Sequence, residues 1–291
     1  MRKTRGDGVT IQLAIWRGGG VPLLCIHGLS ANCHAWDSMA AALAPSHCVL
    51  AMDLRGRGLS ESPPSGYSVW HHCEDIRCVL EDMKLDRIIL VGHSLGAVIA
   101  LTYAAQYPAW VERLILVDGG GKLSKAQTER VFAGIKPSLE RLGRVYPSLE
   151  EYIKSMQSAP FLHPWSKEME AYFRYDVEET LEGVQPRVQP ACIAEEIQNL
   201  QKTDVTRLYP QIACPTLILR AARGMLAKND ILLPPNAVKR MIKQIPNARR
   251  LDIKGVNHYT ILLHPNTSRD EAIRAFIEEE GIVNGRGRET E

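Results

Sequence analysis

The sequence predicts an α/β protein in which a mostly parallel sheet is covered by helices on both faces and is interrupted by an inserted helical cap. Short apolar runs ending in Gly or Asp alternate with segments whose apolar residues recur every three and four positions. This alternation breaks once, between residues 122 and 210. The chain has 291 residues, of which 45% are hydrophobic, so it can bury one large core.

Each predicted element follows from its local pattern. The apolar runs have the composition of buried parallel strands and cover residues 21–28, 47–54, 87–93, 111–119, 214–221 and 248–255. Helical periodicity is found at residues 35–44, 68–85, 94–107, 236–245 and 268–280. Right-handed connections between parallel strands place such helices on both faces of the sheet.

The long interruption at residues 122–210 is rich in aromatic side chains and shows helical patterns. A structureless connection of that length is uncommon in a compact domain. We therefore expect residues 1–121 and 211–291 to form the core and residues 122–210, here called the inserted segment, to form a helical cap. The polar end of the chain, residues 281–291, is expected to fray.

Composition excludes several classes of partner. The formal net charge is +2 and no long basic block is present, so neither nucleic acid nor an anionic membrane is expected to bind. Apolar runs such as residues 21–26 are too short to span a bilayer. We expect a cytoplasmic protein that binds a small molecule, and the sequence leaves its oligomeric state open.

The seven cysteines form no C-x-x-C pair and several lie within predicted strands, which indicates buried thiols and not a disulfide framework. The run "WHHC" at residues 70–73 resembles a metal cluster. Adjacent helical residues point in different directions, however, so no metal site is expected there.

The motif "GHSLG" at residues 92–96 lies where a predicted strand meets a predicted helix. G-x-S-x-G in this context is a nucleophile elbow, because the tight turn requires little bulk two residues before and after the serine. Ser94 is therefore the predicted nucleophile. The N–H of Leu95, at the start of the helix, is a predicted oxyanion donor.

A serine nucleophile needs a base and an acid that orients the base. His258 follows the last predicted strand, at the same sheet edge as Ser94, and is the predicted base, whereas His264 lies in or after the next apolar stretch. Asp230 is the preferred acid because it lies between Ser94 and His258 in chain order and also in the loop after residues 214–221, where the acid of this arrangement is expected. Asp118, after the preceding strand, is the alternative.

The loop after the first predicted strand should supply a second oxyanion donor, the N–H of Leu29. His27 is interpreted as a structural residue that bonds to nearby backbone and braces this turn. The turn at residues 53–58 is likewise expected to brace the loop. Ser30, Tyr259 and Trp165 of the inserted segment are candidate substrate-pocket residues.

These motifs together resemble the α/β-hydrolase superfamily in its capped branch. His27-Gly28, "DLRGRGLS" (53–60), "GHSLG" (92–96), the Asp230 loop and "NHYT" (257–260) occur in the order and spacing of that superfamily over most of the chain. The resemblance implies a hydrolase that works through an acyl-enzyme, with a cap over the pocket and no cofactor. The loop between Arg220 and Asp230 is longer than is common there.

Departures from better-defined subfamilies narrow the predicted reaction. Haloalkane dehalogenases and epoxide hydrolases carry aspartate at the position of Ser94. Carbon–carbon bond hydrolases of ring-cleavage products usually have tryptophan where this chain has Tyr259. A carboxylic ester or lactone hydrolase remains the preferred function. Carbon–carbon bond hydrolysis, acyl transfer to an alcohol or peroxide, and non-enzymatic ligand binding on the same fold stay open as alternatives.

Overall fold

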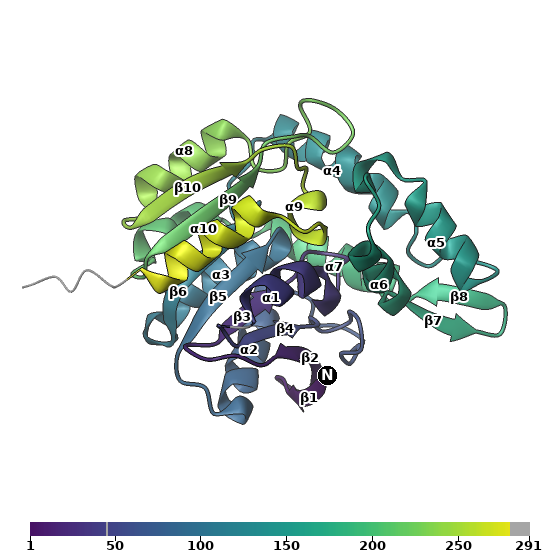
Figure 1. The fold of residues 1–291 in the computed structure, drawn as a ribbon, viewed down its shortest axis with the longest axis horizontal. Helices are drawn as coiled ribbons and strands as arrows, with labels where there is room; N and C mark the ends of the chain where they lie inside the picture. The colour runs from purple at the N-terminus through teal and green to yellow at the C-terminus, as the bar shows by residue number, and fades with distance from the viewer. Residues whose placement is uncertain (45, 280–291) are drawn as a thin grey trace, which may run out of the picture.

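The central element is a mostly parallel sheet, seen in a computed structural model that describes residues 1–44 and 46–279 (Figure 1). Its strand order is β1-β2-β4-β3-β5-β6-β9-β10, in which β2 pairs antiparallel with both β1 and β4 and every other neighbouring pair is parallel. The bounds are β1 (Arg2–Arg5), β2 (Thr10–Trp16), β3 (Leu23–Ile26), β4 (Val49–Met52), β5 (Ile88–His93), β6 (Val111–Val117), β9 (Thr216–Ala221) and β10 (Ala248–Ile253). The predicted fold class is confirmed, and β1 and β2 were not predicted.

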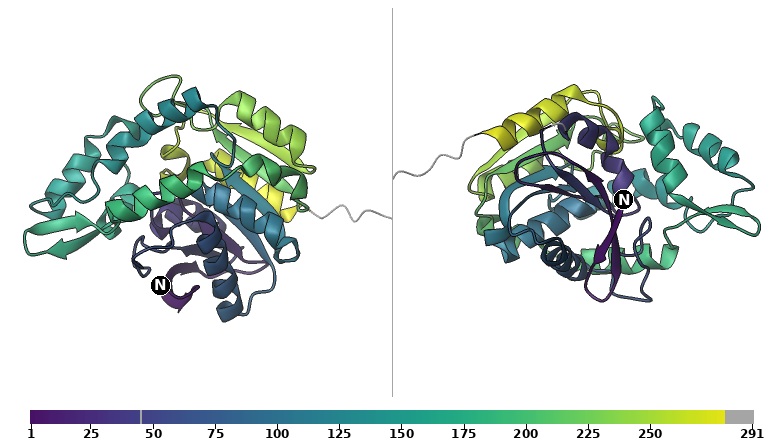
Figure 2. Two further views of the ribbon diagram at one scale, coloured as in Figure 1. Left: turned by 180° about the vertical axis from the view of Figure 1, so that it is seen from behind. Right: turned by 60° about the horizontal axis from the view of Figure 1, so that its bottom comes forward.

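Helices cover both faces of this sheet, because successive strand residues are buried on opposite sides. Leu23 and Cys25 belong to the core beneath α1 (Asp37–Leu43) and α10 (Thr267–Glu278). Leu24 and Ile26 belong to the core beneath α2 (Val69–Met83), α3 (Leu95–Gln106) and α8 (Pro235–Gln244). Figure 1 shows α1 and α10 in front of the sheet, and the rear view in Figure 2 brings α2 and α3 forward.

The inserted segment follows β6 and contains both helices and a hairpin. Its helices are α4 (Lys125–Leu139), α5 (Leu149–Gln157), α6 (Lys167–Tyr175) and α7 (Pro190–Gln201). A serine at the N-cap begins three of them, with Ser124, Ser148 and Ser166 each accepting a backbone N–H three residues on. The hairpin of β7 (Val177–Thr180) and β8 (Gly183–Pro186) was not expected and projects away from the sheet in Figure 1.

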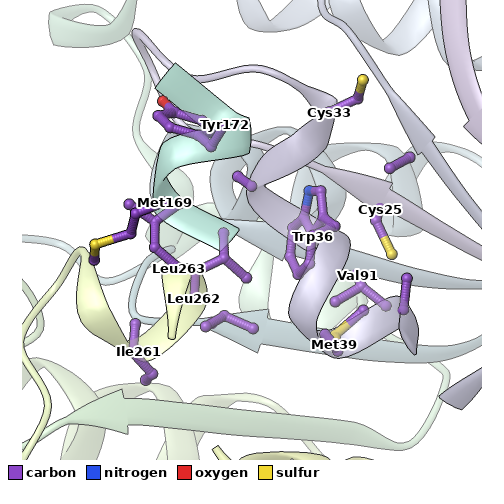
Figure 3. Close-up of a cluster of buried hydrophobic side chains, with 14 of the residues drawn as sticks. Cys25, Cys33, Trp36, Met39, Val91, Met169, Tyr172, Ile261, Leu262 and Leu263 are labelled. Carbon is purple, nitrogen blue, oxygen red and sulfur yellow. The ribbon is translucent and has the colours of Figure 1, made fainter. Parts of the chain in front are cut away.

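The inserted segment packs onto the core through the cluster drawn in Figure 3. Met169 and Tyr172 of α6 lie beside Leu262 of α9 (Thr260–Leu263) and beside Trp36, which ends the short 3-10 turn η1 (Cys33–Trp36). All of these side chains are buried. This packing therefore fixes α6 against two segments of the core, η1 after β3 and α9 after β10.

The thiols agree with the prediction of a chain without disulfides. All seven cysteines lie in the described residues as free thiols, and only Cys48 is partly exposed. Burial raises the pKa of Cys25 and Cys73, as expected for inert core thiols. Within residues 1–44 and 46–279, no helix is long and apolar enough to cross a bilayer. The tail at residues 281–291 lies outside the described residues.

Candidate active site

The nucleophile elbow forms where β5 passes into α3. Ser94 has φ 56° and ψ −115°, a backbone conformation that L residues rarely adopt. A Cβ on Gly92 would lie 2.1 Å from the Gly96 carbonyl oxygen, and one on Gly96 would lie 2.1 Å from that of Ile26. Only glycine fits at either position, so the spacing of the motif has the predicted steric cause.

His258 joins Ser94 to Asp118. The His258 ring lies with Nε2 3.1 Å from Ser94 Oγ and Nδ1 2.8 Å from Asp118 Oδ2. Asp118 and His258 are both buried, so their interaction is little screened by water. With the proton on Nδ1, His258 donates to Asp118 and accepts from the Ser94 hydroxyl, which is the hydrogen-bond order of a Ser-His-Asp triad.

Asp230, the preferred acid in the sequence analysis, bonds elsewhere, so that assignment is corrected in favour of the alternative, Asp118. The Asp230 carboxylate accepts hydrogen bonds from the backbone N–H groups of Met225 (2.7 Å), Leu226 (2.8 Å) and Ala227 (2.9 Å). These bonds fold the loop after β9 back on itself. The extra length of that loop therefore belongs to a closed turn, and it does not extend the carboxylate toward His258.

Sheet order explains why Asp118 reaches His258. Strand β6, which ends just before Asp118, is the direct neighbour of β5, which ends just before Ser94, whereas β9 lies one strand further away. Asp118 has a φ of 43° and donates its N–H to the Leu219 carbonyl (2.7 Å). Its Oδ1 accepts the N–H of Ala221 (3.0 Å). Asp118 is thus anchored to β9 while its second oxygen faces His258.

The loop at residues 27–31, here called the 27–31 loop, packs directly against the nucleophile. A Cβ on Gly28 would lie 3.2 Å from Ser94 Cβ. Leu29 and Leu95 both line the cavity that contains Ser94, and Leu95 begins α3, where a backbone N–H has no partner within the helix. Both predicted oxyanion donors therefore belong to segments in contact with Ser94.

His27 braces this loop as the sequence analysis expected. The Leu54 N–H donates to His27 Nε2 (3.0 Å), which places the ring proton on Nδ1, and Nδ1 donates to the Gly28 carbonyl (2.8 Å). Burial lowers the pKa of His27 to about 3, so the ring is neutral near pH 7. The C=O of Gly28 and the N–H of Leu29 share one peptide plane and point in opposite directions, so His27 also fixes the Leu29 N–H.

The turn at residues 53–58 contacts the same region, as predicted. Asp53 Oδ1 accepts the Cys33 N–H (2.7 Å), and Asp53 Oδ2 accepts the hydroxyl of Tyr175 at the end of α6 (2.5 Å). Burial raises the pKa of Asp53 in spite of these donors. The turn thus links the segment after the 27–31 loop to the inserted segment.

Two residues that support His258 were missed. His93 stacks on the His258 ring, with centroids 4.5 Å apart, and its Nε2 lies 2.9 Å from the His258 carbonyl oxygen. Asn257 Oδ1 accepts the N–H groups of Tyr259 (3.0 Å) and Thr260 (2.9 Å), and Asn257 Nδ2 donates to the Phe161 carbonyl of the inserted segment (2.8 Å). An asparagine before the short helix α9 is a recognisable cap signal, whereas the role of His93 depends on the tertiary fold.

A cavity of about 360 Å³ lies against Ser94 and His258, between the sheet edge and the inserted segment. Ser30 and Tyr259, two of the candidate substrate-pocket residues, lie in its wall. Trp165 does not line it and stacks instead on Phe173, with centroids 5.5 Å apart, so its assignment to the pocket is corrected to packing within the inserted segment. A second cavity of about 330 Å³ also has Ser30 and Tyr259 in its wall.

The "WHHC" run has a structural explanation. His72 is buried, and its Nε2 lies 2.6 Å from Oε2 of Glu196 on α7. Among the residues that the structure describes, no group of three or more His, Cys, Asp or Glu side chains is arranged to hold a metal ion. His72 therefore connects α2 to the inserted segment.

Comparison with known proteins supports the fold described above. Residues 21–265 match the family model described as the alpha/beta hydrolase fold. An uncharacterized protein of Mycobacterium tuberculosis is 41% identical over 104 residues, which are 36% of this chain and 30% of that protein, so the match spans less than a third of the relative's length. A 2-(acetamidomethylene)succinate hydrolase of Mesorhizobium japonicum is 24% identical over 90% of both chains.

Among solved structures, that of E-2-(acetamidomethylene)succinate hydrolase superposes with a TM-score of 0.84 at 23% identity, over 96% of this chain and 98% of the other. This likeness shows a shared fold. The family match, the sheet order and the strand–Ser94–helix turn lead to the same conclusion. The chain belongs to the α/β hydrolase family.

Proposed function

We propose that this protein is a serine hydrolase that cleaves a carboxylic ester with an uncharged, apolar acyl group through an acyl-enzyme. One observation carries the proposal: the His258 ring lies within hydrogen-bond distance of both Ser94 and Asp118, at the wall of a largely apolar cavity. A serine hydroxyl becomes an effective nucleophile in this arrangement because the imidazole can accept its proton.

The proposed reaction has two halves. In the first, Ser94 Oγ attacks the ester carbonyl while His258 Nε2 takes the hydroxyl proton, and Asp118 stabilises the resulting imidazolium. The N–H groups of Leu29 and Leu95 bind the oxyanion, and His258 returns the proton to the departing alcohol. In the second half, His258 takes a proton from a water molecule as the water attacks the acyl-enzyme carbonyl. The bond between the acyl group and Ser94 Oγ then breaks, and His258 returns the proton to Ser94. The products are a carboxylic acid and an alcohol.

The lining of the 360 Å³ cavity supports an apolar acyl group. Helices α4 and α7 contribute several of its aliphatic and aromatic side chains, among them Val131, Phe132, Ile135, Leu139, Ile197 and Leu200. The one cationic side chain in the lining is Lys122, whose Nζ lies 3.5 Å from Asp204 Oδ1. A chain of methylene groups buried there would gain about 0.8 kcal/mol per group.

This lining argues against assigning to this protein the 2-(acetamidomethylene)succinate hydrolase activity named for the relative from Mesorhizobium japonicum. A substituted succinate carries two carboxylates, and buried carboxylates need cationic or N–H partners. The cavity contains no arginine among its lining residues, and its single lysine is already paired. A neutral acyl group therefore suits this cavity better than a dicarboxylate.

The proposal is tested by hydrolysis of p-nitrophenyl esters of increasing acyl length, beside a panel of lactones and a dicarboxylic amide, with wild type and Ser94→Ala. We expect turnover that rises with acyl length to a maximum, stays low for the dicarboxylate and vanishes in Ser94→Ala. Turnover that survives Ser94→Ala would contradict the serine mechanism. Faster cleavage of lactones than of any open-chain ester would show that the protein is a lactone hydrolase instead of an ester hydrolase.

A further inference from the structure

The carbonyl groups of Gly28, Leu29 and Ser30, three consecutive residues of the 27–31 loop, each accept a hydrogen bond from a side chain. His27 holds the first, as described above, and two arginines hold the others. Arg57 Nε lies 3.1 Å from the Leu29 oxygen, and Arg141 Nη2 lies 3.0 Å from the Ser30 oxygen. In an exposed turn, water satisfies the backbone carbonyls, so three side-chain donors on consecutive carbonyls are not needed for hydrogen bonding alone.

Arg57 is held by the inserted segment. It is fully buried and donates through Nη2 to Oε2 of Glu196 on α7 (3.2 Å). The same carboxylate oxygen is 2.6 Å from His72 Nε2. Glu196 is therefore the group that fixes the guanidinium from the side of α7, while Arg57 Nη1 donates to the Arg55 carbonyl (3.0 Å).

Arg141, which follows the end of α4, is likewise held by a buried carboxylate of the inserted segment. Its Nη2 lies 3.0 Å and 3.2 Å from the two carboxylate oxygens of Asp176, the residue after α6. The Tyr152 hydroxyl of α5 donates to the same carboxylate (2.5 Å). The Arg141 and Asp176 side chains are 4% and 1% exposed, so the ion pair is shielded from water.

We propose that Arg57 and Arg141 are positioning residues. They hold the carbonyls of the 27–31 loop so that the Leu29 N–H stays directed at the oxyanion. Glu196 and Asp176 of the inserted segment hold these two arginines in place. The inference rests on the proposed function. Its consequence is that the inserted segment contributes to catalysis through the loop geometry, in addition to forming the cavity wall.

Neither arginine touches the reacting atoms, so the predicted effect differs from that of a substrate-binding residue. A loop released from these bonds still lines the cavity and still binds the acyl group. The Leu29 N–H, however, loses its fixed direction toward the charge that develops in the transition state. Turnover should fall while KM stays nearly constant, because the lost interaction is made only in the transition state.

The test uses paired substitutions that remove each ion pair without leaving a buried charge alone. Arg57→Met with Glu196→Gln keeps an acceptor for His72, and Arg141→Met with Asp176→Asn keeps one for Tyr152. Arg220→Met with Asp252→Asn is the matched control. Arg220 is buried, its Nη1 lies 2.9 Å from Asp252 Oδ2, and neither side chain makes a hydrogen bond to the 27–31 loop or to the 53–58 turn.

For each of the first two paired variants we expect kcat on a p-nitrophenyl ester to fall about 10- to 100-fold with KM changed less than about threefold. Affinity for a trifluoromethyl ketone with the same acyl chain, which forms an oxyanion on Ser94, should weaken by the same factor as kcat. The control pair should change kcat less than about threefold even if its melting temperature drops as far.

Equal losses of kcat in the control and in the two test pairs would show a general packing effect and overturn the inference, as would unchanged kcat in both test pairs. The proposed function is judged separately, on wild type against Ser94→Ala. If wild type cleaves no ester, the rate of fluorophosphonate labelling of Ser94 replaces kcat, because the same N–H groups bind the phosphoryl oxygen. A wild-type Ser94 that resists labelling contradicts both proposals.

Discussion

Asp118 and Asp230 are two buried aspartates in loops that follow neighbouring strands of one sheet, β6 and β9, yet their carboxylates have different partners. Asp118 receives one backbone N–H, from Ala221, and presents its other oxygen to His258. Asp230 receives three backbone N–H groups from its own loop. A buried carboxylate is therefore available to a histidine only where its own loop leaves one of its oxygens without a local donor.

The substitution Asp118→Asn should have the greatest effect on activity. The amide still accepts the Ala221 N–H, so folding should be retained, but the His258 tautomer and the imidazolium lose their anion. We expect kcat to fall on the order of 10⁴-fold with a small change in melting temperature. Steady-state hydrolysis of a p-nitrophenyl ester and a thermal melt measure both. A loss below tenfold would remove Asp118 from the triad.

Asp230→Asn should give the opposite result. Three charge-assisted hydrogen bonds become weaker or are lost, so the free energy of unfolding should drop by about 1 to 3 kcal/mol. We expect kcat to change less than about threefold, since His258 keeps its partner. Urea denaturation and the same ester assay provide the comparison. A fall in kcat as large as that of Asp118→Asn, with stability unchanged, would restore Asp230 as the acid.

Two buried histidines, His27 and His93, should make the stability of the fold depend on pH. His27 is neutral in the folded chain because burial lowers its pKa to about 3, and burial also lowers the pKa of His93 well below its ordinary value. The unfolded chain binds a proton at each of these positions near pH 6.5, while the folded chain does not. Stability is therefore expected to fall as the pH drops below about 6.5, by about 1.4 kcal/mol per pH unit for each such histidine.

The substitution His27→Asn isolates one of these contributions, because the amide can donate to the Gly28 carbonyl but does not titrate. Urea denaturation at pH 7, 6 and 5 should give a flatter dependence for His27→Asn than for wild type. Identical slopes in the two proteins would mean that the neutral state of His27 does not limit stability in acid.

The smallest expected effect concerns Tyr259, which lies beside His258 and donates its hydroxyl to Ser138 Oγ of α4 (2.9 Å). This bond lies where the two cavities share residues. Tyr259→Phe should cost about 0.5 to 1.5 kcal/mol of stability, and kcat for short acyl chains should stay within about threefold. The preferred acyl length, measured on the graded esters, should shift upward as the wall loosens. An unchanged length profile would show that the second cavity is closed to the acyl chain.

Local sequence patterns predicted the sheet strands from β3 onward and the nucleophile turn, because those features depend on neighbouring residues. Ser94 was identifiable since Gly92 and Gly96 are required within five positions of one another. His258 was identifiable as the histidine of the loop after the last strand. The charged edge strand β1 and the hairpin β7–β8 lack a strong apolar pattern, which is why neither was predicted.

Asp118 could not be preferred over Asp230 from the sequence, because the choice depends on which strand lies beside β5 and on how the loop after β9 closes. Arg57 and Arg141 present the same difficulty. Each contacts the 27–31 loop only because residues far apart in the chain, including Glu196 and Asp176, come together in the folded protein.

The most direct test of the central claim is the rate at which a fluorophosphonate labels Ser94 in wild type, Asp118→Asn and Asp230→Asn, followed by intact-protein and peptide mass spectrometry. This rate reports the activated serine without requiring the natural substrate. We expect wild type and Asp230→Asn to be labelled at similar rates, and Asp118→Asn to be labelled more slowly by about three orders of magnitude. Slow labelling of Asp230→Asn together with rapid labelling of Asp118→Asn would contradict the assignment of Asp118 as the acid.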